Sequence, residues 1–87
     1  MADEGWQEIG KITDYFSKVG AVAIKLTGGS LKVGDTVKFK GHTTSFEQVI
    51  TSIQIDNSSV QEANTGDSVG IKIDERVRKH DLVYKKR

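Results

Sequence analysis

The sequence contains neither cysteine nor proline among its 87 residues. Without cysteine the chain can form no disulfide framework and no thiolate metal site, so hydrophobic packing alone must hold the fold together. No apolar run approaches the roughly 20 residues that a membrane-spanning helix requires, and the first residues, MADEG, are acidic and unlike a secretory signal. We therefore expect a small cytoplasmic domain with no membrane partner.

Sustained helical periodicity is also lacking, and short runs of alternating apolar and polar residues take its place. They predict six strands, over residues 7–16, 21–26, 36–40, 46–55, 68–73 and 82–84. A chain of this length hardly fills two packed sheets, and closure of a single sheet removes exposed edges. We predict an all-β fold, a small closed six-stranded antiparallel β-barrel over residues 8–84, with a frayed segment at 1–7 and a basic tail at 85–87.

Two stretches share one local pattern, a Gly-Asp pair followed by a strand. They are LKVGDTV at residues 31–37 and TGDSVGIKI at 65–73, and we expect them to be structural equivalents. Gly10, inside the first predicted strand, indicates a bulge or a close backbone approach. The polar residues 56–64 are predicted to form a loop.

The alternation also predicts which side chains are buried. Val22, Ile24 and Leu26 should share the core face of their strand. In the run 46–55, Val49, Thr51, Ile53 and Ile55 are expected on one face, with Phe46 and Ile50 on the other. We favour Phe16, Phe39 and Phe46 as core residues.

Positive charge collects at the C-terminal end of the chain. Residues 76–87 contain six lysines and arginines against one aspartate, although the net charge of the whole chain is only +1. This distribution is typical of an electrostatic RNA site, and a solubilising tail is the alternative. Tyr15 and Tyr84 would be stacking platforms for bases, beside Lys11, Arg78 and Lys79. The favoured alternative is that both tyrosines cover a sheet edge. The candidate RNA-binding residues are Lys11, Tyr15, Arg76, Arg78, Lys79, Tyr84, Lys85, Lys86 and Arg87.

Four segments in order resemble the second domain of translational GTPases such as elongation factor Tu: IGKI at 9–12, LKVGDTV at 31–37, ANTGDSVGI at 63–71 and RKHDLV at 78–83. The resemblance covers about residues 8–84 and implies a six-stranded antiparallel barrel, here a stand-alone domain without its GTPase. It also implies a contact between Asp67 and the aminoacylated end of tRNA, and the favoured alternative is that Asp67 caps its own turn. His80 stands where the family usually has glycine.

Catalytic and cofactor sites are not expected. Residues 5–12, GWQEIGKI, imitate a phosphate-binding loop, but Ile12 stands where a magnesium-ligating Ser or Thr is needed and a strand follows, so we expect no bound nucleotide. His42 and His80 lack the convergent partners that a metal site or a catalytic base requires, and we assign both to the surface.

The sequence is therefore interpreted as a non-catalytic, translation elongation factor-like module that binds tRNA, rRNA or the ribosome. The alternative is a protein-interaction or scaffold domain that accompanies an enzyme on another chain. No cofactor and no metal are expected in either case.

Overall fold

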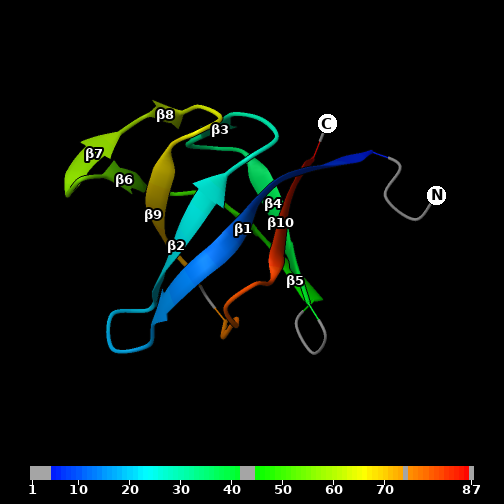
Figure 1. Cartoon of the computed structure of the whole chain (residues 1–87), viewed down its shortest axis with the longest axis horizontal. Coiled ribbons are helices and arrows are strands. Elements are labelled where there is room, and N and C mark those ends of the chain that lie inside the picture. The colour runs from blue at the N-terminus through cyan, green and yellow to red at the C-terminus, as the bar shows by residue number, and fades with distance from the viewer. Residues whose placement is uncertain (1–4, 42–44, 74, 87) are drawn as a thin grey trace.

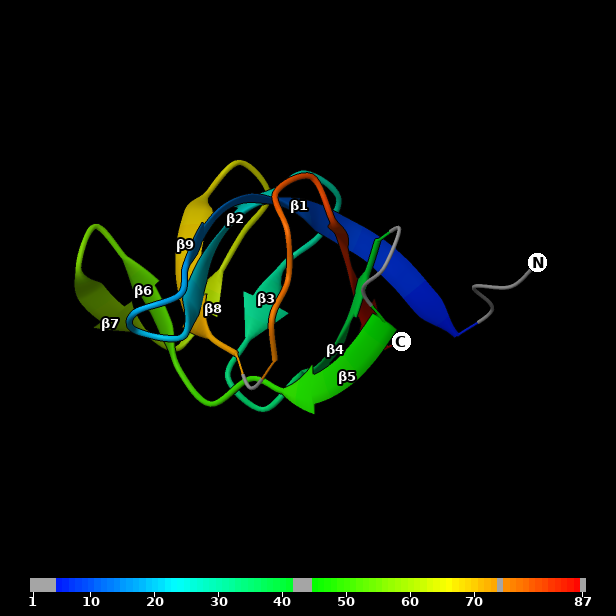
Figure 2. The same cartoon turned by 90° about the horizontal axis from the view of Figure 1, so that it is seen from below.

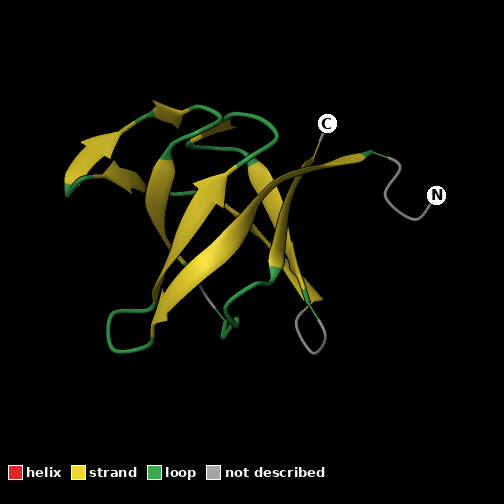
Figure 3. Cartoon of the chain, in the orientation of Figure 1, coloured by secondary structure: helices red, strands yellow, loops and turns green. Residues whose placement is uncertain are grey.

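The computed structural model describes residues 5–41, 45–73 and 75–86, and every regular element within these ranges is a strand (Figure 3). The strands are β1 (Trp6–Phe16), β2 (Ala21–Leu26), β3 (Leu31–Lys32), β4 (Thr36–Lys40), β5 (Ser45–Val49), β6 (Ile53–Ile55), β7 (Ser58–Val60), β8 (Glu62–Ala63), β9 (Ser68–Lys72) and β10 (Leu82–Lys86). In this described part of the chain there is no helix that could span a membrane. The prediction of an all-β fold is confirmed.

Eight of the strands form one antiparallel sheet, in the order β5-β4-β10-β1-β2-β9-β6-β7 (Figure 1). The short strands β3 and β8 pair with each other and lie at the top of this view. Five of the predicted strands agree with observed ones to within two residues at either end. The sixth, residues 46–55, is divided into β5 and β6.

β1 pairs with strands in both halves of the sheet, because two irregularities in its register bend it. Its first part pairs with β10 and its second with β2, and the register shifts between Glu8 and Gly10 and again between Ile12 and Asp14. A Cβ at Gly10 would stand 2.5 Å from the carbonyl oxygen of Lys25, so only glycine fits there. The predicted bulge and the predicted close approach at Gly10 are both confirmed.

The inner face of the sheet is lined by buried aliphatic side chains and by Phe39. Val22, Ile24 and Leu26 are each at most 1% exposed, as the alternation in β2 predicts. The loop before β10 adds Val77, which is 2% exposed and has no strand pattern around it. The core is therefore single and continuous, as a domain of this size requires.

The predicted face assignment in residues 46–55 is wrong because the chain leaves the sheet between β5 and β6. Ile50 and Ile53 are each 1% exposed, although an unbroken strand would place residues three apart on opposite faces. Val49, by contrast, is 52% exposed. The break at 50–52 shifts the alternation by one residue, so both isoleucines reach the core.

Residues 56–64, predicted to be a loop, contain β7, β8 and a tight hairpin between β6 and β7. Asp56 and Asn57 join the two hairpin strands and have φ angles of 52° and 66°. Positive φ at both central residues is typical of a type I′ turn, whose twist matches that of its strands. Asp and Asn adopt this conformation more readily than other residues with side chains, which explains the hairpin.

Three four-residue turns lead directly into β4, β9 and β10, and each is closed by an aspartate. They span residues 32–35, 64–67 and 78–81 and end at Asp35, Asp67 and Asp81. In each turn the aspartate N–H donates to the carbonyl of the first residue, at 3.0, 3.0 and 3.2 Å. The aspartate carboxylate accepts the N–H of that same residue, at 2.8, 2.9 and 3.0 Å. We call these turns the aspartate corners.

Each aspartate corner is also bonded to a buried aliphatic residue elsewhere in the chain. The N–H of the third turn residue donates to the carbonyl of the aliphatic residue. The N–H of the aliphatic residue donates in return to the aspartate carbonyl, and all of these distances are 2.8 or 2.9 Å. The aliphatic partners, in order, are Ile50, Leu26 and Ile12. The expected equivalence of segments 31–37 and 65–73 is confirmed, and the corner at 78–81 is a third copy.

The third residue of each aspartate corner has a positive φ, as in a type II turn. It is Gly34 at 99°, Gly66 at 99° and His80 at 74°. Glycine adopts this conformation freely, whereas a residue with a Cβ does so at a cost of about 1–2 kcal/mol. The corner at His80 is therefore strained where the other two are relaxed.

The two ends of the described chain are paired with each other. Trp6 of β1 lies opposite Lys86 of β10, and the Lys85 Nζ donates to the Ser30 carbonyl at 2.8 Å. The paired strands thus extend beyond the expected range 8–84 on both sides. Arg87 lies outside the described residues.

Replacing a corner aspartate by alanine should lower the free energy of unfolding, because a turn N–H loses its acceptor. We expect a loss of about 1.5 kcal/mol for Asp67→Ala and of about 2–3 kcal/mol for Asp81→Ala, since Asp81 is 6% exposed. Asp67→Asn keeps an acceptor oxygen and should recover most of the loss. Urea denaturation gives these values, with Glu47→Ala at an exposed position of β5 as the control. Losses no larger than the control's would show that the carboxylates do not hold the corners.

His80→Gly should raise the free energy of unfolding by about 0.5–1 kcal/mol. Relief of the positive φ contributes about 1–2 kcal/mol, and the greater freedom of glycine in the unfolded chain offsets about 0.4–1 kcal/mol of it. Lys79→Gly, one residue earlier in the same turn, relieves no such strain and should lower stability. A Tm for His80→Gly at or below that of the wild type would contradict the strain at this corner.

Candidate functional site

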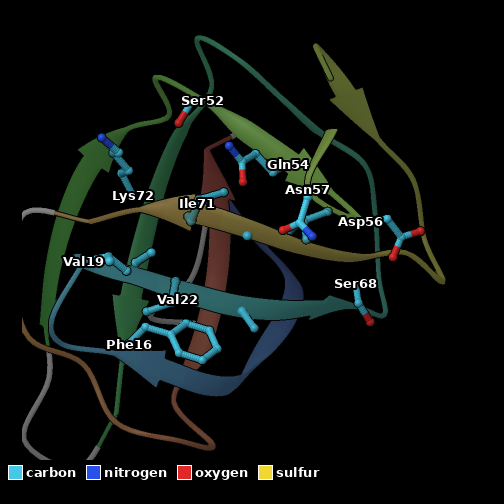
Figure 4. A pocket seen from close by; sticks show the side chains of 14 residues that line it. Phe16, Val19, Val22, Ser52, Gln54, Asp56, Asn57, Ser68, Ile71 and Lys72 are labelled. Atoms are coloured by element: carbon cyan, nitrogen blue, oxygen red, sulfur yellow. The ribbon is translucent and has the colours of Figure 1, made fainter. Parts of the chain in front are cut away.

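An open groove of about 620 Å³ crosses the outer face of β2, β9 and β6 (Figure 4). The residues of β2 and β9 that point away from the core along this face are mostly small. They include Ala21, Ala23, Ser68 and Gly70. The floor of the groove is therefore shallow, and the backbone of the sheet lies close to solvent.

Strand register aligns the smallest of these positions across the sheet. Ala23 of β2 lies opposite Gly70 of β9, and Gly70 lies opposite Gln54 of β6. One row away, Ala21 lies opposite Lys72. The middle of the floor thus consists of a methyl group and a glycine, flanked by a longer amide side chain.

The connection between β1 and β2 supplies an apolar wall on one side of the groove. Phe16 is 48% exposed and Val19 is 67% exposed, and Figure 4 shows both beside the groove. The N–H groups of Val19 and Gly20 donate to the Phe16 carbonyl at 3.2 and 3.0 Å, which folds this connection back over the end of β1. The prediction that Phe16 is a core residue is wrong, because Phe16 lies opposite Ala21 on the outer face.

Polar groups line the remainder of the groove. Lys72 and Asp56 lie at its opposite ends in Figure 4. Ser52, Gln54 and Asn57 lie between them on the β6 side and offer hydroxyl and amide groups. The groove therefore combines an apolar wall, a bare floor and a charge of opposite sign at each end.

The basic residues predicted to bind RNA are divided between the two ends of β10. Arg76, Arg78 and Lys79 are exposed in the segment before the strand, and Lys86 is exposed at its far end. Lys85 is engaged with the Ser30 carbonyl. The described members of this cluster therefore do not form a single patch.

The remaining predicted site residues are dispersed as well. Lys11 is exposed on β1 between Leu82 of β10 and Lys25 of β2. Tyr15 is half-buried against the core, which agrees with the edge-cover alternative. Tyr84 is half-buried in the middle of β10.

Asp67, the residue that the resemblance placed near the end of tRNA, is engaged in its own corner. Its carboxylate accepts the N–H of Asn64 at 2.9 Å. This is the turn-capping role that was the alternative for this residue.

His80 is exposed in its corner, and His42 lies outside the described residues. Within residues 5–41, 45–73 and 75–86, no group of three or more His, Asp and Glu side chains is placed to hold a metal ion. Residues 6–12, which imitate part of a phosphate-binding loop in sequence, form the start of β1.

The chain matches no protein-family model. Over 78 residues, 88% of this chain, it is 40% identical to an uncharacterised protease of Methanocaldococcus jannaschii. It is 31% identical over 78 residues to a collagenase of Porphyromonas gingivalis. The aligned segments are 19% and 22% of those proteins, so the chain spans about a fifth of the length of the curated relatives it matches.

Solved structures show the same fold. The C-terminal domain of a protein described as a U32 peptidase, from Geobacillus thermoleovorans, has a TM-score of 0.86 at 20% identity, with 93% of each chain covered. GDP-bound aIF5B from Aeropyrum pernix has a TM-score of 0.62 at 21% identity, with 97% of this chain but 16% of that chain covered.

The assignment to a translation factor module that binds RNA is wrong. The similar sequences are a protease and a collagenase, and the better structural match is a domain of a U32 peptidase. The Gly-Asp segments that carried the resemblance are aspartate corners, whose residues close turns and start strands. They specify a backbone geometry, which different functions can share.

The groove was missed because its residues become neighbours only through the pairing of β2, β9 and β6. One signal for it is present in the sequence, a glycine inside the cleanest alternating run of the chain. Gly70 interrupts that run on the outward side, where a strand usually carries a larger residue.

Proposed function

We propose that the chain is a non-catalytic accessory domain that works with a peptidase of the kind found in these comparisons. The observation that carries this proposal is the 40% identity to the Methanocaldococcus jannaschii protease, over a segment that is 19% of that protein. Most of the protease lies outside the similar segment, and we assign the catalytic work to that part. This agrees with the scaffold alternative drawn from the sequence.

The groove supports an accessory role because apolar side chains are exposed along it. Phe16 and Val19 expose apolar area beside a floor without large side chains. Exposed apolar side chains gathered along a groove with a polar rim are typical of protein-interaction sites.

The chain should bind the Porphyromonas gingivalis collagenase from which the similar 78-residue segment has been removed. We expect a one-to-one complex with a Kd on the order of micromolar, measured by isothermal titration calorimetry. The chain alone should not hydrolyse gelatin, and its addition should raise hydrolysis by the truncated enzyme. The intact collagenase is the control and should not bind, because its own segment occupies the position.

A chimera tests the same proposal if the truncated enzyme does not fold. In it this chain replaces the 78-residue segment of the collagenase. We expect the chimera to be more active than the truncated enzyme. No complex in the titration and no gain of activity in the chimera would together exclude the accessory role.

We also propose that the large sheet closes on itself as a barrel. β5 and β6 lie near opposite ends of the strand order but are separated by only residues 50–52. The Gln48 Nε2 of β5 donates to the Lys72 carbonyl of β9 at 2.8 Å. Figure 2, in which the strands curve around a common interior, agrees with closure.

Closure predicts nuclear Overhauser effects between β5 and the end of β9. The Gln48 side-chain amide should show cross-peaks with Lys72. The side-chain amide of Gln54, on the outer face of the sheet, is the control and should show no cross-peaks with β5. Absence of the Gln48 cross-peaks in an otherwise assigned spectrum would indicate an open sheet.

A further inference from the structure

Gly70 is a glycine that the fold itself does not require. Of the nine glycines, the other eight have either a positive φ or an atom within 3.0 Å of the place where a Cβ would stand. At Gly70 the nearest atom is the Val22 carbonyl oxygen at 3.9 Å, an ordinary van der Waals contact. β9 has no register shift on either side, so no bulge accounts for it. Glycine inside a strand weakens it, and it often marks a bulge, a tight bend of a barrel strand, or a close approach of another backbone or a ligand. The register excludes the bulge, and the open space above Gly70 favours the close approach.

The space above Gly70 is the middle of the groove. Ala23 and Gln54 flank it in the same cross-strand row. Because neither Gly70 nor Ala23 carries a side chain beyond Cβ, a partner's main chain can reach the surface of the sheet there. A helix presents side chains rather than its backbone to a surface, so this floor suits an extended segment better.

The charged residues at the two ends of the groove indicate which charges the bound segment should carry. Lys72 lies at one end and Asp56 at the other, and neither forms an ion pair with another described residue. The side of the groove along β9, from Ser68 to Lys72, has room for about four or five extended residues at roughly 3.3 Å each. Phe16 and Val19 offer apolar contact at the Lys72 end of that span, because Phe16 lies opposite Ala21 and Ala21 lies opposite Lys72.

We propose that the groove binds an extended polypeptide segment with an acidic residue beside Lys72, an apolar residue next to it against Phe16 and Val19, and a basic residue beside Asp56. The segment belongs to the peptidase part that this domain accompanies, so this inference rests on the proposed function. Main-chain contact over Gly70 and the charges at the ends set its position, and the apolar wall provides most of the buried area.

Variants of the groove test the proposal in the titration against the truncated collagenase. Gly70→Val should raise Kd at least tenfold while its Tm equals or exceeds that of the wild type, since valine favours a strand. Val19→Glu, at a position that is 67% exposed, should also raise Kd at least tenfold. The matched controls are Val49→Glu, at a 52% exposed valine of β5, and Ser45→Val, and both should change Kd less than twofold.

Overlapping ten-residue peptides that cover the rest of the collagenase identify the segment. We expect one peptide, with an acidic and a basic residue about four positions apart, to compete with the truncated enzyme for this chain. Lys72→Glu should weaken the binding of that peptide at least tenfold.

The outcomes separate the two proposals. If the wild type binds the truncated enzyme and Gly70→Val and Val19→Glu bind equally well, the groove is not the interface, although the accessory role stands. Binding of the enzyme without binding of any peptide would overturn the extended segment. If the wild type binds gelatin through Gly70 but not the truncated enzyme, the occupant is a substrate chain and this inference is wrong.

Discussion

The aspartate carboxylate that accepts an N–H from its own turn is the interaction on which the sheet depends. It occurs at Asp35, Asp67 and Asp81, each directly before a strand. A turn that opens a strand leaves N–H groups without strand partners, and a short carboxylate satisfies one of them locally. Because each corner also exchanges two backbone bonds with a buried aliphatic residue, the start of β4, β9 and β10 and the position of three core side chains are fixed together. A chain without cysteine or proline thus obtains its rigid points from hydrogen bonds.

The two faces of the sheet carry side chains of different size. Inward positions are filled by side chains such as Ile24 and Phe39, which are 0% exposed, and their packing holds the domain together. Four of the six outward positions on β2 and β9 carry alanine, serine or glycine, although larger β-branched residues would make better strands. Where the groove lies, the sheet therefore contains residues with a lower propensity for strands than the positions would otherwise favour. Such local departures from what stabilises a fold are expected where a surface meets a partner.

Much of the fold could be predicted because its signals are local. The Gly-Asp pairs define turns within four residues, and the alternation of Val22, Ile24 and Leu26 defines a core face within one strand. The break in residues 46–55 could not be predicted, because Ile50 is held out of the strand by bonds to Gly34 and Asp35, far away in sequence. The groove depends on register between three strands, which no single stretch encodes. The family assignment failed for a related reason, since the motifs that carried it describe turn geometry and contain no chemistry.

The pairing of Trp6 with Lys86 places the two ends of the domain about one strand spacing apart, near 5 Å. They lie at one end of β1, whereas Phe16 lies at its other end, roughly 30 Å away along the strand, and the groove extends from Phe16 back toward the middle of β1. A domain of this shape can be joined to another polypeptide at either end, or inserted into one of its loops, without a long linker and without covering the groove. The ends of the paired strands are thus separated from the Phe16 wall by the length of β1, so a connection at those ends and a contact at that wall could change independently of each other.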